Sequence, residues 1–393
     1  MAACSKTEGG AGGPAELAAH RIAEIRTLKL RTRWPRLLGR NARLEEHGYG
    51  RELLIREILT DRGAAGWGLS RRLPPQDTPD LVGRRLSDLF DPRLGVTAPE
   101  AMPLDLPLHD LAGQILQQPV FRMLGAKGQT AVPVYGGATY MDDITPAYAP
   151  GGLGVVLEHC RQDYEMGYRG FKIKIGRGWR WMQPEPGLRR DIEVTRAVRQ
   201  HFPHCRIMVD ANDTYTCDDF LRYFQAVADC DLYTIEEPFP ENRRDLARLR
   251  ELIEKLSPAT TVTEGESSPD VKLLLELAEE RLVNILNLDI EGYGFTPWRR
   301  LAPEAIGRGA LLSPHAFDLR LKTYYGAQLL AGVGGASPLE GVLDHTEGAD
   351  DDAYAFEEGV LRLPAEPGFG LRLIWGRQYD RDGRDDSGHK LML

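Results

Sequence analysis

Short apolar runs alternate with amphipathic stretches along most of the chain after residue 130. Between the runs, apolar residues recur at helical spacing, as over residues 246–256, and Thr216 stands three residues before Asp219, as in a helix capping box. Eight strands that alternate with helices are typical of a parallel (β/α) barrel. The predicted strands are residues 132–136, 171–175, 206–210, 232–236, 260–266, 283–290, 310–315 and 336–341.

An open, doubly wound sheet is the alternative for such a pattern. It needs a glycine-rich phosphate loop between its first strand and its first helix. The nearest match, residues 332–335 (GVGG), lies late in the chain and precedes a strand. The pattern therefore favours the barrel.

The segments on either side of the barrel have a different character. Residues 52–61 read as a strand that runs into the turn DRGAAGWG, which predicts a hairpin or a meander. Residues 86–124 read as helical with a break at Pro119. After an acidic stretch, strand-like runs return near residues 360–363 and 371–375. The expected division is a flexible tail (1–15), an α+β unit (16–128), the barrel (129–345) and a C-terminal segment that returns to the α+β unit (346–393).

Composition narrows the function classes. The 393 residues carry a net charge of −9, which argues against general nucleic-acid binding. No apolar run is long enough to cross a membrane, and the N-terminus lacks the layout of a signal peptide. Five cysteines without a CxxC pair argue against a disulfide framework and a thiolate zinc site, so we expect reduced thiols in a cytoplasmic protein.

Ionisable residues stand at the ends of the predicted strands, where barrel enzymes carry their chemistry. These ends lie between 23 and 36 residues apart, about one strand–helix unit each. Charges at the ends of apolar strands are costly unless they are paired or bind a metal. From the second strand to the eighth, the residues are Lys174, Asp210, Glu236, Glu266, Asp289, His315 and Glu340.

Three of these residues predict a metal site. Asp210, Glu236 and Glu266 follow consecutive strands, and ligation by oxygen alone suits a hard divalent ion, Mg²⁺ first, with Mn²⁺ as the alternative. Glu237 is expected to point away, because neighbouring residues of a strand face opposite sides. Glu264 shares the face of Glu266, so its participation stays open.

The remaining strand ends predict acid/base groups. Lys172 and Lys174 share a strand face, and two ammonium groups near a cation are expected to lower each other's pKa, which would free a neutral base. Asp289 can orient the imidazole of His315 and raise its basicity. A metal between two such groups suits removal of the α-proton of a carboxylate through a metal-stabilised enediolate, and Glu340 could hydrogen-bond the developing oxyanion.

The ordered motifs KIK, VDAN, IEEP, GES, LNLDI, SPHAF and PLEG, over about residues 130–345, resemble the mandelate racemase subgroup of the enolase superfamily. The resemblance implies a modified (β/α)7β barrel of the TIM type with an N-terminal α+β capping domain. It implies Asp210, Glu236 and Glu266 as Mg²⁺ ligands. It also implies Lys174 with Lys172 as the base on one face of the substrate, and His315 assisted by Asp289 on the other. Asn212, Lys172 and Glu340 are expected to bind the substrate.

The resemblance also implies a reaction class. Most relatives that have both KxK and the His–Asp pair are acid-sugar dehydratases, so dehydration of an acid sugar to a 2-keto-3-deoxy acid is the leading prediction. Racemisation or epimerisation of a 2-hydroxy acid or an amino-acid derivative uses the same groups and is the alternative. A non-catalytic metal-binding relative and a Schiff-base aldolase are further hypotheses. The expected partners are a small carboxylate substrate and further copies of this chain.

Two stretches depart from the family pattern. Residues 176–187 form a long loop with Trp179 and Trp181, which predicts a partial lid or an oligomer contact, and residues 291–297 (EGYGFTP) replace a Gly-Gly stretch. The capping segment from Trp34 to Tyr49 is expected to close over the site. Its arginines would then meet a sugar acid or lie on the solvated surface.

Overall fold

The computed structural model describes residues 14–70, 80–267, 269–341, 343–374 and 377–379. Residues 1–13 of the predicted tail lie outside this part, and helix α1 (Pro14–Ala18) begins within the tail's predicted range. Among the described residues, none of the helices combines the length and the apolar character needed to cross a bilayer.

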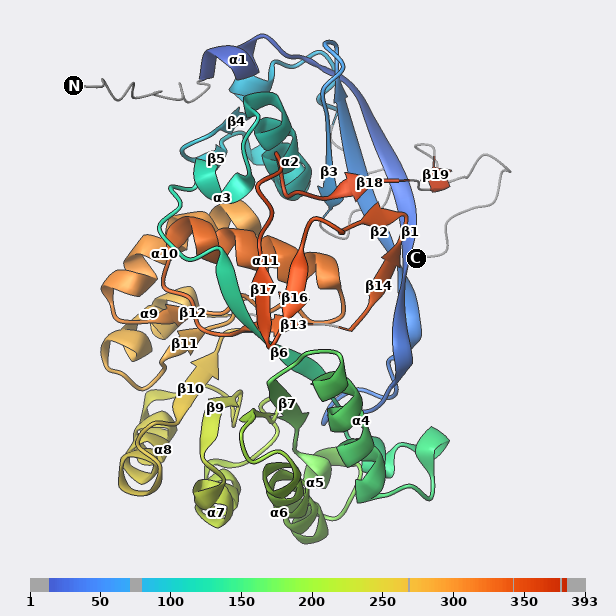
Figure 1. The fold of residues 1–393 in the computed structure, drawn as a ribbon. Coiled ribbons are helices and arrows are strands. Elements are labelled where there is room, and N and C mark those ends of the chain that lie inside the picture. The colour runs from blue at the N-terminus through green and yellow to red at the C-terminus, as the bar shows by residue number, and fades with distance from the viewer. Residues whose placement is uncertain (1–13, 71–79, 268, 342, 375–376, 380–393) are drawn as a thin grey trace, which may run out of the picture.

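A parallel sheet wraps into a barrel at the centre of the molecule (Figure 1). Its strands follow the order β12-β11-β10-β9-β8-β7-β6, and β13 pairs with the free side of β6. A parallel bridge between Leu312 and Ala336 joins the two ends of this order. Each predicted strand overlaps an observed one: β6 (Ala131–Thr139), β7 (Gly170–Lys174), β8 (Arg206–Asp210), β9 (Leu232–Glu236), β10 (Thr261–Glu264), β11 (Ile285–Leu286), β12 (Leu311–Leu312) and β13 (Leu339–Gly341).

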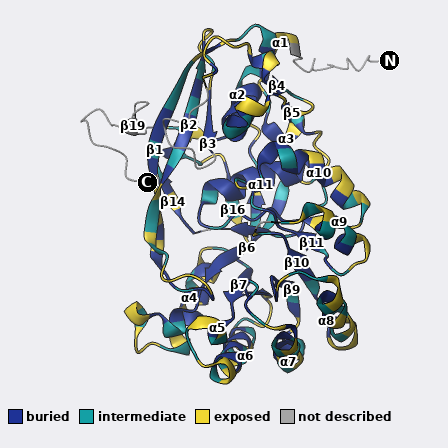
Figure 2. Ribbon diagram, turned by 180° about the vertical axis from the view of Figure 1, so that it is seen from behind, coloured by how far each residue is buried: buried dark blue, intermediate teal, exposed yellow. Residues whose placement is uncertain are grey.

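Helices cover the outside of the barrel. Most of them have exposed outer faces while the strands beneath are buried (Figure 2), whereas α11 (Arg320–Val333) is buried along almost its whole length. The predicted cap is present, because the Thr216 hydroxyl accepts a hydrogen bond from the Asp219 N–H at 3.2 Å. The helices are α4 (Leu153–Glu165), α6 (Pro184–His201), α7 (Cys217–Val227), α8 (Arg243–Leu256), α9 (Val271–Glu279), α10 (Phe295–Gly307) and α11 (Arg320–Val333).

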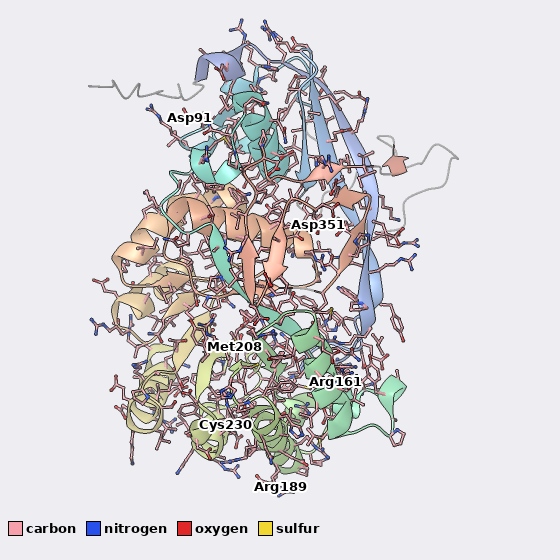
Figure 3. The ribbon with its side chains drawn as sticks, viewed as in Figure 1. Asp91, Arg161, Arg189, Met208, Cys230 and Asp351 are labelled. Atoms are coloured by element: carbon pink, nitrogen blue, oxygen red, sulfur yellow. The ribbon has the colours of Figure 1, made fainter. Side chains whose placement is uncertain are left out.

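Side chains separate by polarity across this wall. Met208 on β8 is fully buried within the barrel, whereas Arg161 on α4 and Arg189 on α6 lie at the periphery (Figure 3). The glycines at 332–335 end α11 rather than begin a helix, so they do not form a dinucleotide-binding loop.

A long antiparallel sheet stands beside the barrel (Figure 1). The predicted hairpin is confirmed as β2 (Gly48–Thr60) and β3 (Ala65–Leu69). Strand β1 (Ile22–Leu38) was not predicted, although leucines alternate with charged residues from Leu28 to Arg31. Helix α2 (Asp105–Leu116) packs tightly on β3, since a Cβ at Gly66 would lie 2.3 Å from the Leu111 nitrogen.

The predicted helical region 86–124 is only partly helical. Its second half holds α2 and α3 (Val120–Met123), separated at Pro119 as expected. The prediction of an α-helix is wrong for its first half, because Asp91, Pro92 and Gly95 favour turns there. This half consists of η2 (Leu86–Asp88), β4 (Phe90–Asp91), β5 (Gly95–Val96) and η3 (Pro99–Leu104).

The C-terminal segment connects the barrel to the long sheet. Strands β14 (His345–Glu347) and β19 (Arg377–Tyr379) pair with β1, while β17 (Val360–Arg362) pairs with β6. Two short antiparallel pairs complete it: β16 (Ala355–Glu357) with β17, and β15 (Ala349–Asp350) with β18 (Arg372–Leu373). The predicted strands near 360–363 and 371–375 therefore correspond to β17 and β18.

Asp110 links three parts of the chain. It is buried on α2, and its two carboxylate oxygens accept hydrogen bonds from the N–H groups of Trp67 on β3 (3.0 Å) and Phe369 of the C-terminal segment (2.9 Å). Burial outweighs these hydrogen bonds and raises the pKa of Asp110 to about 7.

Replacing Asp110 by alanine should lower the free energy of unfolding by about 2–4 kcal/mol, because two buried N–H groups lose their acceptors. The raised pKa makes the folded protein bind the extra proton, so the wild type should lose stability as the pH rises from about 4 to about 7, and Asp110→Ala should lose less. Urea denaturation at several pH values measures both effects. Glu251→Ala, on the exposed face of α8, is the control, and equal stability of the two variants would contradict the prediction.

Candidate functional site

Three carboxylates converge at the carboxyl ends of neighbouring strands. Asp210 and Glu236 end β8 and β9 in register with each other, and Glu266 lies two residues beyond β10. Each offers an oxygen that lies within 4.8 Å of the others. One oxygen of Glu266, Oε2, is buried without a hydrogen-bond partner. Three converging carboxylates and one unpartnered oxygen fit a hard divalent ion.

The two neighbouring glutamates lie outside this group. At Glu237 the backbone takes a φ of 42°, in the left-handed region, so the chain turns directly after Glu236. The carboxylate of Glu264 instead approaches those of Asp213 and Glu241. Glu264 therefore groups with other acids than Glu266, although the two share a strand face in the sequence pattern.

Both predicted lysines reach the acidic group from β7. Lys172 Nζ lies 2.8 Å from Glu236 Oε1, 3.0 Å from Glu340 Oε1 and 3.4 Å from Asp210 Oδ2. Lys174 Nζ donates a hydrogen bond to Asp210 Oδ2. Both ammonium groups are buried, so each depends on these carboxylates.

Among the protein groups alone, the carboxylates raise the pKa values of both lysines, so the predicted lowering depends on a cation that competes for these carboxylates. Burial lowers the pKa of Lys172, but Glu236 and Glu340 outweigh burial and raise it well above its ordinary value. Burial likewise lowers the pKa of Lys174, and Asp210 raises it above the ordinary value. Lys172 does lower the pKa of Lys174, as predicted, but the carboxylates at hydrogen-bonding distance dominate.

Asp289 and His315 form the predicted pair. They follow β11 and β12, where their backbones make a parallel bridge, and His315 Nδ1 lies 2.9 Å from Asp289 Oδ2. His315 Nε2 faces Glu266 Oε1 at 3.4 Å and Glu340 Oε2 at 3.6 Å. Burial lowers the pKa of His315, but Glu266, Asp289 and Glu340 together raise it to about 9.

Lys322 is a member of the site that the sequence analysis missed. It is buried near the start of α11, with Nζ 3.1 Å from Asp289 Oδ2 and 3.4 Å from Glu291 Oε2. Asp289 therefore has two cationic partners, His315 and Lys322, and they hold its pKa below the ordinary value against the effect of burial. A lysine in a helix that carries only one other charged residue, Arg320 at its start, was the signal that could have revealed it.

Glu340 occupies space that a glycine leaves free. It lies on β13, buried, between Lys172 and His315. The neighbouring strand β6 carries Gly137, where an added Cβ would lie 2.3 Å from Glu340 Oε1. Any larger residue at 137 would push Glu340 out of its position between the two cations.

Asn212 also lies where the sequence analysis placed it, two residues after Asp210. Its N–H donates to Asp210 Oδ1 at 2.9 Å, and its side-chain oxygen is buried without a hydrogen-bond partner.

The capping segment reaches the site through a residue that was not predicted. His47 packs against Tyr140 and Phe317, with ring centroids 4.8 and 5.4 Å away. His47 Nδ1 lies 2.7 Å from the Gly39 carbonyl oxygen, and Nε2 is buried without a partner. The hydroxyl of Tyr140 is likewise buried and unpartnered.

Two arginines of this segment, Arg36 and Arg40, contact other parts of the chain, whereas Arg43 donates a hydrogen bond to the carbonyl of the site residue Asn212 at 2.6 Å. Arg36 is buried in an ion pair with Asp163 at 2.6 Å. It therefore neither faces a sugar acid nor lies on the solvated surface, and both predictions for it are wrong. The guanidinium of Arg40 lies over the Trp181 ring at 4.4 Å. Asp163 is itself buried, and the pair avoids the larger cost of burying either charge alone.

The inserted loop supports the capping segment. It forms α5 (Arg177–Arg180) and the start of α6. Trp181 Nε1 donates to the Asn41 carbonyl at 2.7 Å, and Arg180 donates to the Arg43 carbonyl at 2.8 Å. Residues 176–187 therefore hold the chain around residues 40–45 in place.

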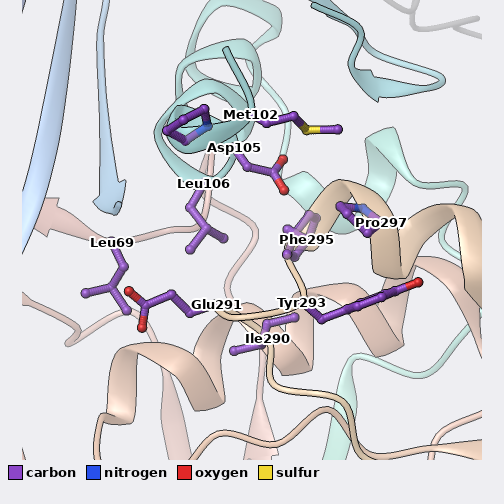
Figure 4. A pocket seen from close by; sticks show the side chains of 11 residues that line it. Leu69, Met102, Asp105, Leu106, Ile290, Glu291, Tyr293, Phe295 and Pro297 are labelled. Carbon is purple, nitrogen blue, oxygen red and sulfur yellow. The ribbon is translucent and has the colours of Figure 1, made fainter. Parts of the chain in front are cut away.

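The other divergent loop, 291–297, lies at the junction of the two units. It lines a pocket together with Leu69, Met102 and Leu106 of the capping side (Figure 4). Asp105 of α2 fixes the loop, since its Oδ2 accepts a hydrogen bond from the Thr296 N–H at 2.7 Å.

Comparison with known proteins agrees with this architecture. Residues 155–376 match the family model of enolase C-terminal domain-like proteins. The chain is a member of the enolase superfamily, in the mandelate racemase subgroup. The capping domain and barrel predicted from the sequence are confirmed as the fold of this superfamily.

Two solved structures from Geobacillus are similar over most of their length. A galacturonate dehydratase, complexed with D-galacturonate and 5-keto-4-deoxy-D-galacturonate, has a TM-score of 0.84 and 31% identity, over 91% of this chain and 95% of that one. A mandelate racemase/muconate lactonizing protein, complexed with magnesium and tartrate, has a TM-score of 0.85 and 31% identity, over 91% and 93%. Magnesium in such a neighbour and the acidic group here confirm the predicted cofactor.

Curated relatives include both predicted enzyme classes. An L-Lys-D/L-Arg epimerase from Methylococcus capsulatus is 27% identical, over 89% of this chain and 90% of that protein. A D-xylonate dehydratase from Haloferax volcanii is 24% identical, over 69% and 66%. The match to a hydrophobic dipeptide epimerase from Enterococcus faecalis spans 52% of each chain.

In the metal-free protein, NMR titration should give His315 a pKa of about 9. Asp289→Asn removes a charged hydrogen-bond acceptor and should lower this pKa by about 1 unit or more. The resonance is assigned by its loss in His315→Asn. An unchanged pKa in Asp289→Asn would contradict the electrostatic account of the pair.

Proposed function

We propose that this protein is a magnesium-dependent acid-sugar dehydratase that acts on a hexuronate of the D-galacturonate type. The observation that carries the proposal is the opposition of two proton-transfer groups across one acidic cluster. Lys172 and Lys174 come from β7 and His315 follows β12. Strands β8 to β11 separate them on one side of the barrel, and β6 and β13 on the other. The 31% identity to a galacturonate dehydratase supports the substrate class.

Asp210, Glu236 and Glu266 are the proposed metal ligands. Bound there, Mg²⁺ supplies positive charge that stabilises the negative charge developing on the substrate carboxylate. Lys172 bridges Glu236 and Glu340 and so fixes the edge of this site nearest β6. Glu340 and Asn212 are proposed to contact the substrate.

Lys174 is the proposed base. Its carboxylate partner, Asp210, is shared with a second cation in the loaded enzyme, which favours the neutral amine. The amine takes the proton from the carbon next to the carboxylate, C5 of a hexuronate. The electron pair of the broken C–H bond then delocalises into the carboxylate, whose oxygens take on the additional negative charge.

His315 is the proposed acid. Its hydrogen bond to Asp289 raises its pKa, which favours a protonated imidazole that can give its proton to the departing C4 hydroxyl, which leaves as water. The resulting enol takes up a proton at C4 and becomes a 5-keto-4-deoxy sugar acid. Counted from the carboxylate carbon, this is the 2-keto-3-deoxy acid expected from the sequence.

Unpartnered polar atoms around the site support a polyhydroxylated substrate. The buried atoms without partners include Tyr140 Oη, His47 Nε2 and the side-chain oxygen of Asn212. Sugar hydroxyls can both donate to and accept from such groups, whereas an apolar side chain would leave them unsatisfied. This favours an acid sugar over the hydrophobic dipeptides that one relative epimerises.

Epimerisation is the second candidate, because the same two groups could exchange a proton across the substrate. The epimerase relatives support it. We also propose a cytoplasmic location, since the described cysteines at 160, 205, 217 and 230 are all free and buried. Assembly into a homo-oligomer stays a prediction from the family resemblance.

Proton NMR in D₂O with Mg²⁺ tests the reaction directly. Incubation with D-galacturonate, beside a panel of other uronates and aldonates, should consume one substrate and give a keto-deoxy product with deuterium in the new methylene group. Exchange of the α-proton without product would replace dehydration by epimerisation. No exchange with any acid sugar, in protein shown to bind Mg²⁺, would refute the proposal.

Single substitutions separate the two proton transfers. Lys174→Ala should abolish both the C5 exchange and turnover, with a loss of about 10²–10⁴-fold or more. His315→Asn should abolish product formation but keep slow exchange at C5, because Lys174 still removes that proton. Arg189→Ala, on the outer side of α6, serves as the control for loss of a charge. Unchanged turnover in both site variants, with metal bound, would overturn the assigned roles.

A further inference from the structure

A second group of carboxylates lies beside the proposed metal site. Asp213, Glu241 and Glu264 each offer an oxygen that lies within 4.8 Å of the other two. Glu264 ends β10, and Asp213 and Glu241 lie in the loops that follow β8 and β9, so the same three strands position both groups. Asp213 stands three residues beyond Asp210, Glu241 five beyond Glu236, and Glu264 two before Glu266, and none of them belongs to the first group.

Glu264 is the residue that makes this group unusual. It ends β10 with 0% exposure, and both of its carboxylate oxygens are buried without a hydrogen-bond partner. One oxygen of Asp213, Oδ1, is likewise buried without a hydrogen-bond partner. A buried carboxylate without a partner costs several kcal/mol unless a proton or a cation neutralises it.

Backbone contacts order this region without satisfying the carboxylates. The Asp213 N–H donates to the Glu237 carbonyl at 2.8 Å, and the Glu264 carbonyl accepts from the Asn287 N–H at 3.1 Å. The Asp213 backbone is held at a φ of 57°. The main-chain groups therefore have partners, while the side-chain oxygens of Glu264 do not.

The guanidinium of Arg43 lies next to this group but does not donate hydrogen bonds to its carboxylates. Arg43 of the capping segment donates to the carbonyl oxygens of Asn212 at 2.6 Å and Asp213 at 3.5 Å. It makes no hydrogen bond to the three carboxylates in the described part of the chain. The other close neighbour, Glu237, is itself a buried acid and adds negative charge.

We propose that Asp213, Glu241 and Glu264 bind a second divalent cation. Ligation by oxygen alone selects a hard ion, Mg²⁺, Mn²⁺ or Ca²⁺. The ion neutralises Glu264 and ties the loops after β8 and β9 to the end of β10. Because both sites use these three strands, the second ion fixes the positions from which Asp210, Glu236 and Glu266 project. This site is independent of the proposed substrate and reaction.

Counting bound metal tests the proposal. Protein stripped with EDTA and dialysed against Mn²⁺ should hold two ions per chain, measured by elemental analysis. Glu264→Gln keeps the shape of the side chain and should hold one, and Glu266→Gln should also hold one. Glu251→Gln, an exposed change of the same charge on α8, should hold two. One ion in the wild type, or two in Glu264→Gln, would overturn the second site.

Melting temperatures distinguish a cation from a shared proton. In the Glu266→Gln background, Mn²⁺ should still raise the melting temperature, and adding Glu264→Gln should remove that rise. Without metal, Glu264→Gln should melt no lower than the wild type, because it removes a buried unpaired charge. Loss of stability in Glu264→Gln without metal, and no rise with Mn²⁺ in Glu266→Gln, would show that a proton satisfies Glu264 instead.

Discussion

The crowding of negative charge at one edge of the barrel governs the rest of this molecule. Parallel strands bring their carboxyl ends together, so acids that are far apart in the sequence become neighbours. Asp210, Glu236, Glu266 and Glu340 would repel one another without positive charge between them. Lys172, Lys174 and His315 supply that charge in the protein chain itself, and each is buried with the acids that it neutralises.

This balance explains why the same residues can hold a metal and move protons. A cation that binds the carboxylates competes with the ammonium groups for them, so the charge of one group depends on the presence of the other. Lys322 extends the balance behind Asp289, where it keeps that carboxylate ionised opposite His315. The site is one coupled set of charges, and substitutions within it are expected to be non-additive.

The sequence was sufficient for the barrel and for the residues at its strand ends. Alternating apolar runs located all eight strands, and the regular spacing of ionisable residues located Asp289 and His315 even though β11 and β12 are only two residues long. Local patterns could not reveal contacts between distant segments. His47 and Lys322 reach the site only through packing of the cap and of α11, and the lysine pKa values depend on distances that spacing does not give.

The sequence-based predictions that failed outside the site failed for the same reason. The strand β1 alternates regularly, but its many arginines hid a pattern that only pairing with β2, β14 and β19 stabilises. Arg36 has no local feature that marks it as buried, because its partner Asp163 lies on a helix of the barrel. Ion pairs between units are set by the tertiary fold rather than by neighbours in the sequence.

The contact between the inserted loop and the capping segment has a consequence for how specificity can change. Trp181 and Arg180 hold the backbone of Asn41 and Arg43, a few residues before His47 enters the site. A capping segment transplanted from a relative that lacks this loop would lose its support and its angle of approach. Residues 176–187 and the segment around 39–48 must therefore be exchanged together in laboratory recombination, and we expect them to change together as the family diverges.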